Sequence, residues 1–289
     1  MQLQEFFDKP HLLPNIPEVV QDLIATFNDP DPDIFRIIDD LSRDPVLSAK
    51  VLRLANSSRF GGVREIASVK EASIRLGLER LRTLVIASGL ISATTGLPGI
   101  DLKKFWENSF LTAELCRQLA VSAGLPAEQQ FTCGMLHDIG LLILVVSHPK
   151  EADDIMALTS RQGRVKAEQA VLGFTSAEIG AELARRWQFP LTVVNGLKHQ
   201  FSPLNGDFSP EAALVYLSTW LVEQGGGADA RPEWSENLAM TLGVQLRKGD
   251  EPPPSWPEQV AKKVGLDWPA LVSAQEAVAR DGSPFLMAV

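Results

Sequence analysis

Apolar residues recur every three or four positions through most of the chain, whereas the strict alternation typical of a β-strand is almost absent. Within residues 17–30, for example, Val19 or Val20, Leu23 and Phe27 lie on one helical face. A helix with one apolar face buries that face against other helices. The sequence therefore predicts an all-α fold.

Two breaks divide this helical pattern. The segment TTGLPGIDL is the clearest interruption in the middle of the chain, and three consecutive glycines at 225–227 follow the last strong helical stretch. We therefore expect an N-terminal helical part over residues 1–98 and a helical bundle over residues 99–225. In the remainder, 226–289, KGDEPPPSWPEQ predicts a Pro-rich surface loop or hinge, and WPALVSAQEAVARD is long enough for one docking helix.

Composition and charge restrict the class of protein. Hydrophobic residues make up 45% of the 289 positions, enough to bury one large core or two smaller ones. We find no apolar run that predicts a transmembrane helix and no signal-peptide pattern, which together indicate a cytoplasmic protein without membrane association. The net charge of −9 disfavours nucleic acid as a partner, except at local basic clusters such as Arg75, Arg80 and Arg82.

Motifs for nucleophilic or phosphate chemistry are scarce. The chain has no Gly-rich phosphate loop, no GxSxG turn and no Cys–His arrangement with a supporting residue. Its two cysteines, Cys116 and Cys133, lie among apolar residues and lack CxxC spacing. We interpret them as buried free thiols, with a disulfide or a reactive pair as the alternative.

The segment GMLHDIGLLIL places His137 and Asp138 side by side within an apolar helical pattern. Two polar groups in such surroundings need compensation. Either they bind a metal together with ligands from distant parts of the chain, or they are hydrogen-bonded within the core. A catalytic metal needs three or more protein ligands and an open position. Of the other histidines, His11 and His148 look like surface residues, and His199 alone falls at a helix end that could reach the pair.

Several segments carry a resemblance to a known family. In this order, FWENSFLTAELCRQLA, FTCGMLHDIGLLIL, LGFTSAEIGAELARRWQFP and GLKHQFSP resemble the HD superfamily of metal-dependent phosphohydrolases. In the front half, LPNIPEVVQDL, LSRDPVLSAKVLRLANSS and SIRLGLERLRTLVIAS resemble more closely its HDOD branch, the HD-related output domains of bacterial signalling proteins. The resemblance implies an HD-like helical bundle preceded by a second helical N-terminal subdomain.

The chain departs from catalytic HD-GYP relatives where the resemblance places their metal ligands. Asn108 and Ser176 stand at positions that carry histidines in those enzymes. Gln200 replaces the second histidine of a pair that begins at His199, and Thr219 stands where an aspartate closes the site. Neutral Asn, Ser, Gln and Thr are poor ligands for Mn, Fe or Zn. The resemblance therefore implies an incomplete, degenerate metal site.

These departures lead to a functional hypothesis and an alternative. We expect a non-catalytic regulatory or scaffolding module of bacterial signal transduction, without a cofactor, that binds a signalling protein or a small-molecule ligand. The pair would then persist in a buried hydrogen-bonded network with the polar substitutes. The alternative is an HD-type phosphohydrolase acting on a phosphodiester or nucleotide, with a reduced metal site at His137, Asp138 and His199.

Overall fold

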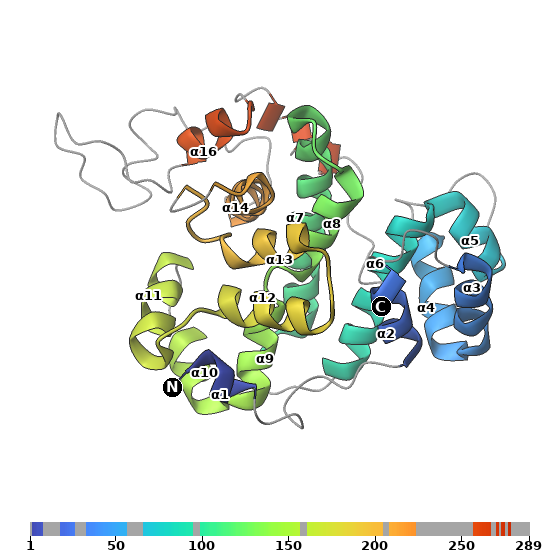
Figure 1. Ribbon diagram of the computed structural model, residues 1–289, viewed down its shortest axis with the longest axis horizontal. Coiled ribbons are helices and arrows are strands. Elements are labelled where there is room, and N and C mark those ends of the chain that lie inside the picture. Colours follow the sequence, from blue (N-terminus) through green and yellow to red (C-terminus); the bar gives the residue numbers. More distant parts are fainter. Residues whose placement is uncertain are drawn as a thin grey trace.

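The structure is a computed structural model that describes residues 2–7, 18–26, 33–56, 66–94, 99–156, 161–204, 208–223 and 257–266, and at the C-terminal end 270–271, 273–274 and 277–278. Every regular element within these ranges is a helix, which confirms the predicted all-α fold (Figure 1). His11, the segment SSRFGG and the glycines at 225–227 lie outside the described residues.

The N-terminal bundle forms one end of the molecule (Figure 1). Local chemistry sets several of its helix ends as the sequence predicts. Asp44 accepts a hydrogen bond from the backbone N–H of Leu47, Pro45 begins the following helix, and Gly77 at φ 79° separates two helices. The helices of the N-terminal bundle are α2 (Glu18–Ala25), α3 (Ile34–Arg43), α4 (Pro45–Ala55), α5 (Val69–Leu76) and α6 (Leu78–Thr94).

The second bundle follows the break after α6. Its first helix starts at the predicted cap, because the side chain of Asp101 accepts a hydrogen bond from the backbone N–H of Lys104. Its members are α7 (Leu102–Ala123), α8 (Ala127–Leu136), α9 (Ile139–Ser147), α10 (Pro149–Met156), α11 (Arg161–Leu172), α12 (Ser176–Arg186), α13 (Leu191–Lys198) and α14 (Pro210–Glu223).

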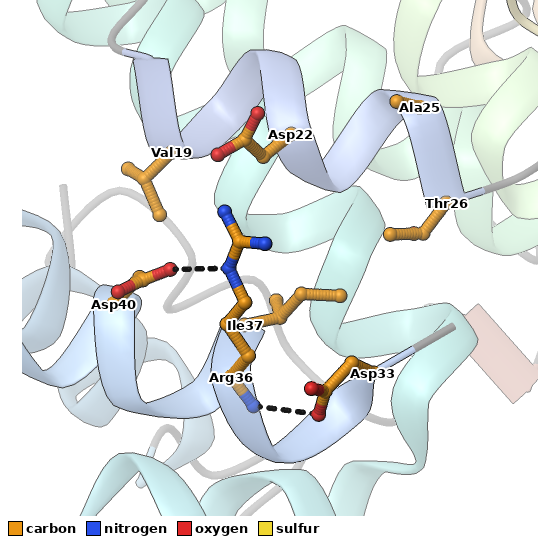
Figure 2. A pocket seen from close by; sticks show the side chains of 8 residues that line it. All are labelled: Val19, Asp22, Ala25, Thr26, Asp33, Arg36, Ile37 and Asp40. Atoms are coloured by element: carbon orange, nitrogen blue, oxygen red, sulfur yellow. Dashed lines mark hydrogen bonds and ion pairs between the residues drawn. The ribbon is translucent and has the colours of Figure 1, made fainter.

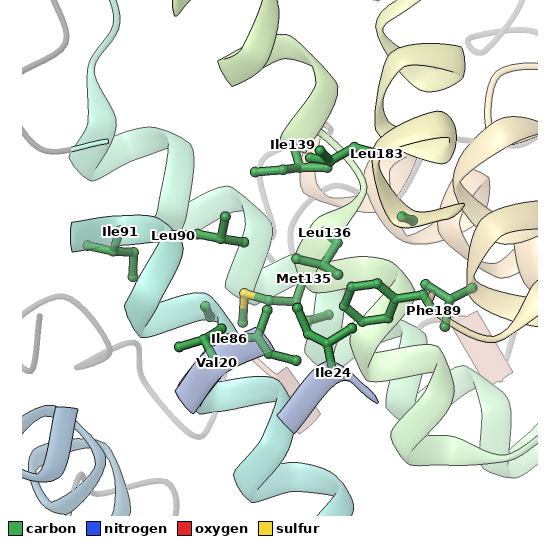
Figure 3. Packing of buried hydrophobic residues seen from close by; sticks show 14 of the residues in the cluster. Val20, Ile24, Ile86, Leu90, Ile91, Met135, Leu136, Ile139, Leu183 and Phe189 are labelled. Carbon is green, nitrogen blue, oxygen red and sulfur yellow. The ribbon is translucent and has the colours of Figure 1, made fainter. Parts of the chain in front are cut away.

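The two bundles share one hydrophobic core. Figure 3 shows Ile24 and Ile86 of the N-terminal bundle beside Met135 of α8 and Phe189 of the second bundle, within one cluster of buried residues. A buried polar contact joins the bundles as well, since the hydroxyls of Thr83 on α6 and Thr132 on α8 lie 2.7 Å apart. The chain thus builds one continuous core across the two bundles.

The short helix α1 (Leu3–Phe6) packs on the second bundle (Figure 1). The ring of Phe6 stacks on that of His148 with centroids 5.0 Å apart and meets the edge of Phe174 at 5.7 Å. The next ring, Phe7, carries the guanidinium of Arg186 at 4.6 Å from its centroid. His148, interpreted from the sequence as a surface residue, is therefore half-buried. The proposed segment boundary at residue 98 stays a prediction.

The C-terminal part packs on the second bundle through α16 (Pro257–Lys263). Val260 and Leu266 are buried together with Leu217 of α14 in a second hydrophobic cluster. The end of KGDEPPPSWPEQ is therefore helical rather than loop, because Pro257 suits the first turn of a helix. The docking helix predicted in WPALVSAQEAVARD is described only in part, and residues 270–271, 273–274 and 277–278 are helical.

One stretch, Ala127–Ser147, is long and apolar enough to cross a membrane by length and composition, which the sequence analysis did not anticipate. However, 83% of its most apolar window is buried inside the protein. The stretch comprises α8 and α9, which form the centre of the second bundle. The protein core thus accounts for its apolar character.

Two glycines allow very close helix crossings around the His–Asp pair. A Cβ atom at Gly140 of α9 would lie 1.9 Å from the backbone oxygen of Ser176 on α12. One at Gly134 of α8 would lie 2.5 Å from the Cα atom of Ala113 on α7. Larger residues cannot occupy either position without moving a helix. The crossing at Gly140 holds the residue pair just before it against the start of α12.

Gly140→Ala is expected to lower the free energy of unfolding by about 3 kcal/mol or more, because a backbone atom blocks the added methyl group. Urea denaturation measures this change. The matched control is Gly180→Ala on α12, where the nearest atoms would be 3.3 Å away. Alanine has a better helix propensity than glycine, by about 1 kcal/mol, and this gain should largely offset the steric cost of the methyl group at position 180. Equal losses in the two variants would contradict the close crossing.

Candidate functional site

His137 and Asp138 lie at the junction of two helices. The α8 helix ends at Leu136 and α9 begins at Ile139, so the structure replaces the continuous helix expected from the sequence with a break at the pair. At this break the two neighbouring side chains converge, with His137 Nε2 lying 3.5 Å from Asp138 Oδ2. The polar pair thus occupies a helix end, where the backbone itself has unpaired groups.

The imidazole of His137 is buried and oriented by the backbone. Its exposed fraction is 5%, and its Nδ1 lies 2.7 Å from the carbonyl oxygen of Gly134. Because a carbonyl only accepts, we assign the proton to Nδ1, which leaves Nε2 facing Asp138. A histidine that ligates a metal is oriented in the same way by a carbonyl. The orientation alone is therefore compatible with metal binding.

The side chain of Asp138 forms an ion pair with a guanidinium. Arg164 of α11 donates from Nη2 to Asp138 Oδ1 at 3.1 Å, while its Nε lies 3.6 Å from Glu168 Oε1. Arg164 and its second partner, Glu168, both lie on a helix that begins 23 residues further along the chain, at Arg161. The sequence analysis did not single out either residue. Their spacing of four on one helix is the signal that could have found them.

Glu168 is fully buried and links α11 to α12. Its Oε2 accepts a hydrogen bond of 2.7 Å from the backbone N–H of Ser176, the first residue of α12. Burial raises the pKa of Glu168, and the bond from Ser176 and the charge of Arg164 counteract that increase. A carboxylate at a helix N-terminus also interacts favourably with the helix dipole. We refer to His137, Asp138, Arg164, Glu168 and Ser176 as the buried polar cluster.

Two of the predicted degenerate ligand positions contact this cluster. Ser176 is buried and binds Glu168 through its backbone, as described above. Gln200 is fully buried, and its Nε2 donates to the carbonyl oxygens of His137 at 2.6 Å and Leu197 at 3.1 Å. Gln200 therefore holds the main chain of the pair rather than its side chains.

The other predicted positions are placed differently. Thr219 is buried and bonds to its own helix at the carbonyl oxygens of Val215 and Tyr216. Asn108 is exposed on α7, so it is not part of a buried network. His199 ends α13 and is half-buried. The expected network among the four polar substitutes is thus replaced by one that depends on Arg164 and Glu168.

The residues around the pair do not fit the metal centre of an HD enzyme. Within the parts of the chain that the structure describes, no three His, Cys, Asp or Glu side chains gather in a group that could hold a metal ion. Asp138 instead contacts a permanent cation, Arg164. A divalent metal requires several anionic or imidazole ligands, and a neighbouring guanidinium opposes it electrostatically.

The cysteines lie apart from any reactive arrangement. Cys116 and Cys133 are both free and buried, which confirms the interpretation from the sequence. Burial raises the pKa of the Cys116 thiol to about 12 and that of Cys133 well above its ordinary value. A thiol is nucleophilic only when deprotonated. Neither residue is therefore a candidate nucleophile.

An open pocket of about 250 Å³ lies in the N-terminal bundle, between α2 and α3. Figure 2 shows the guanidinium of Arg36 near the carboxylates of Asp22 and Asp40, with its Nε 3.7 Å from Asp40 Oδ2, while Asp33 accepts a hydrogen bond from the backbone N–H of Arg36. The pocket shares no lining residue with the buried polar cluster. It is lined by Val19, Asp22, Ala25, Thr26, Asp33, Arg36, Ile37 and Asp40.

Comparisons with known proteins agree with this fold. The HDOD domain family matches residues 13–203, more than half of the chain, and the chain belongs to this family. A solved structure named "Putative phosphohydrolase" from Shewanella amazonensis SB2B is 32% identical, covers 94% of this chain and 97% of its own, and has a TM-score of 0.69. An HDOD domain protein of unknown function from Geobacter sulfurreducens is 22% identical over 97% of both chains, with a TM-score of 0.68.

A curated relative is longer. An uncharacterized protein of Treponema pallidum (strain Nichols) is 28% identical over 216 residues. The match covers 72% of this chain but 40% of the relative, so the similarity spans less than half of that protein.

His137→Ala is expected to lower the free energy of unfolding by about 1–3 kcal/mol, since it leaves buried polar partners unsatisfied. The melting temperature should fall by several degrees, as measured by calorimetry. Asn108→Ala is the matched control: its side chain is exposed on a helix, so its stability should change by less than about 0.5 kcal/mol. A wild-type melting curve for His137→Ala would show that the imidazole is solvated.

Proposed function

We propose that this HDOD chain is a non-catalytic regulatory or scaffolding module of bacterial signal transduction that acts in the cytoplasm by binding a protein partner or a small ligand. The observation that carries the proposal is the ion pair between Asp138 and Arg164. The aspartate of the His–Asp motif is committed to a side chain of the protein itself. Its neighbours include a guanidinium, which opposes the divalent cation that an HD enzyme would bind there.

The lack of a fitting ligand set bears directly on catalysis. A metal-dependent hydrolase obtains its nucleophile by lowering the pKa of a metal-bound water. Polar groups of the cluster could act only as weak bases towards an ordinary water, and Glu168 is fully buried. Hydrolysis of a phosphodiester by the usual HD chemistry is therefore not expected of these residues.

Features of the N-terminal bundle support partner binding. Among the described residues, large exposed apolar side chains of this bundle include Phe35 on α3, Val46 on α4 and Ile74 on α5, with exposed fractions of 74%, 58% and 77%, while others such as Leu191 lie on the second bundle. Exposed apolar residues that form a contiguous patch mark surfaces where proteins bind one another. The open pocket between α2 and α3 belongs to the same bundle. We expect a protein partner or small ligand to bind this bundle.

The second candidate function is an HD-type phosphohydrolase. Two observations favour it: the name of the Shewanella structure, and the orientation of His137, whose Nδ1 is held by a carbonyl as in a metal ligand. In that case His137, Asp138 and His199 would hold the metal. The pairing of Asp138 with Arg164 is the reason we place this function second.

Enzymatic assay separates the two candidates. We expect no turnover of cyclic dinucleotides or of a chromogenic phosphodiester, with or without added Mn²⁺, because no described group of residues can activate water through a metal. Product release would be followed by chromatography and absorbance. Hydrolysis by the wild type that disappears in His137→Ala would establish the phosphohydrolase instead.

A further inference from the structure

One guanidinium lies between two carboxylates from different helices. Arg164 donates to Asp138 at 3.1 Å on one side and lies 3.6 Å from Glu168 on the other. The second oxygen of Asp138 faces His137 Nε2 at 3.5 Å. A divalent cation bound by Asp138 would have to share this space with the guanidinium.

The charge of Arg164 cannot be removed by deprotonation. A guanidinium stays protonated in proteins, unlike a lysine or a histidine, which can lose its proton to make way for a metal. Burial alone would lower the pKa of Arg164, but Asp138, Glu168 and Glu223 raise it, and the pKa lies above its ordinary value. The positive charge is therefore permanent.

We propose that Arg164 takes the place of a metal ion as the counter-charge of Asp138 and excludes divalent cations from the His–Asp pair. This inference deepens the proposed non-catalytic function and rests on it. It explains how the pair keeps its place without a metal: the electrostatic requirement of the carboxylate is met by α11. The chain then needs neither a metal nor a complete ligand set to keep α9 and α11 together.

A double-variant cycle tests the counter-charge. Arg164→Met removes the positive charge that lies between the carboxylates of Asp138 and Glu168, so the melting temperature should fall by several degrees or more. Adding Asp138→Asn should recover part of that loss, because it neutralises one of the two carboxylates. Should Arg164→Met not fold, recovery of a folded protein in the double variant is the expected result.

Manganese tests the exclusion. Mn²⁺ should leave the melting temperature of the wild type unchanged, since Arg164 opposes its binding. It should raise that of Arg164→Met, where the guanidinium no longer opposes a cation at Asp138 and where Mn²⁺ would bind only the folded state. Asp138→Asn in the same background should abolish the rise.

An exposed pair provides the matched control. Arg185 on α12 binds Glu182 at 2.7 Å but is largely exposed. The effects of Arg185→Met and Glu182→Gln on the melting temperature should therefore be nearly additive. Mn²⁺ should change the melting temperature of neither variant.

Three results would overturn the proposal: an Arg164→Met/Asp138→Asn protein no more stable than Arg164→Met, a wild type that Mn²⁺ stabilises through Asp138, or a folded Arg164→Met protein whose melting temperature Mn²⁺ leaves unchanged. These outcomes are distinct from failure of the proposed function, which would appear as phosphodiester turnover by the wild type. A failed cycle without turnover would refute the role of Arg164 alone.

Discussion

A carboxylate held largely away from water needs a positive charge or hydrogen-bond donors close by, and in this protein Arg164 supplies both to Asp138. The same guanidinium lies beside Glu168, which in turn binds the first N–H of α12. Two side chains of α11, Arg164 and Glu168, thus connect the α8–α9 junction to the start of α12. This connection determines which charged groups surround the His–Asp pair.

The backbone around the pair is equally constrained. Gly134 and Gly140 let α8 and α9 lie against α7 and α12 at distances that no side chain permits. Gln200 binds the carbonyl oxygen of His137, which fixes α13 against the same junction. At a helix crossing of this kind, an imidazole and a carboxylate can stabilise the protein through their contacts without taking part in a reaction. A structural role therefore accounts for the pair without a metal.

Local features could be predicted from the sequence because they depend on neighbouring residues alone. The cap at Asp101, the helix start at Pro45 and the break at Gly77 each follow from the conformational preferences of one or two residues. The His–Asp pair stands out as two polar residues within an apolar helical pattern, whereas Gln200 follows from the family motifs, which record positions that meet in space. The fold class followed from helical periodicity in the same way.

The spacing of four between Arg164 and Glu168 is a local signal for an ion pair on one helix, but the contact of Arg164 with Asp138 spans 26 residues and does not follow from local preferences. Arg164 lies in the first turn of α11, which begins at Arg161, so the sequence has few helical residues before it. Asn108 shows the opposite problem. The resemblance places Asn108 at a ligand position, but Asn108 is exposed on α7, whereas its neighbour Ser109 is buried. Alignment with a motif therefore needs to be checked against the helical face.

Metal content is the most direct test of the claim that the protein itself supplies the counter-charge of Asp138. The protein would be purified without chelators and without a metal-affinity tag, dialysed, and examined by elemental analysis. The account predicts well under one equivalent of Mn, Fe, Ni or Zn per chain, because Arg164 occupies the position of the cation. One equivalent of a transition metal that survives dialysis, and is lost in Asp138→Asn, would contradict it.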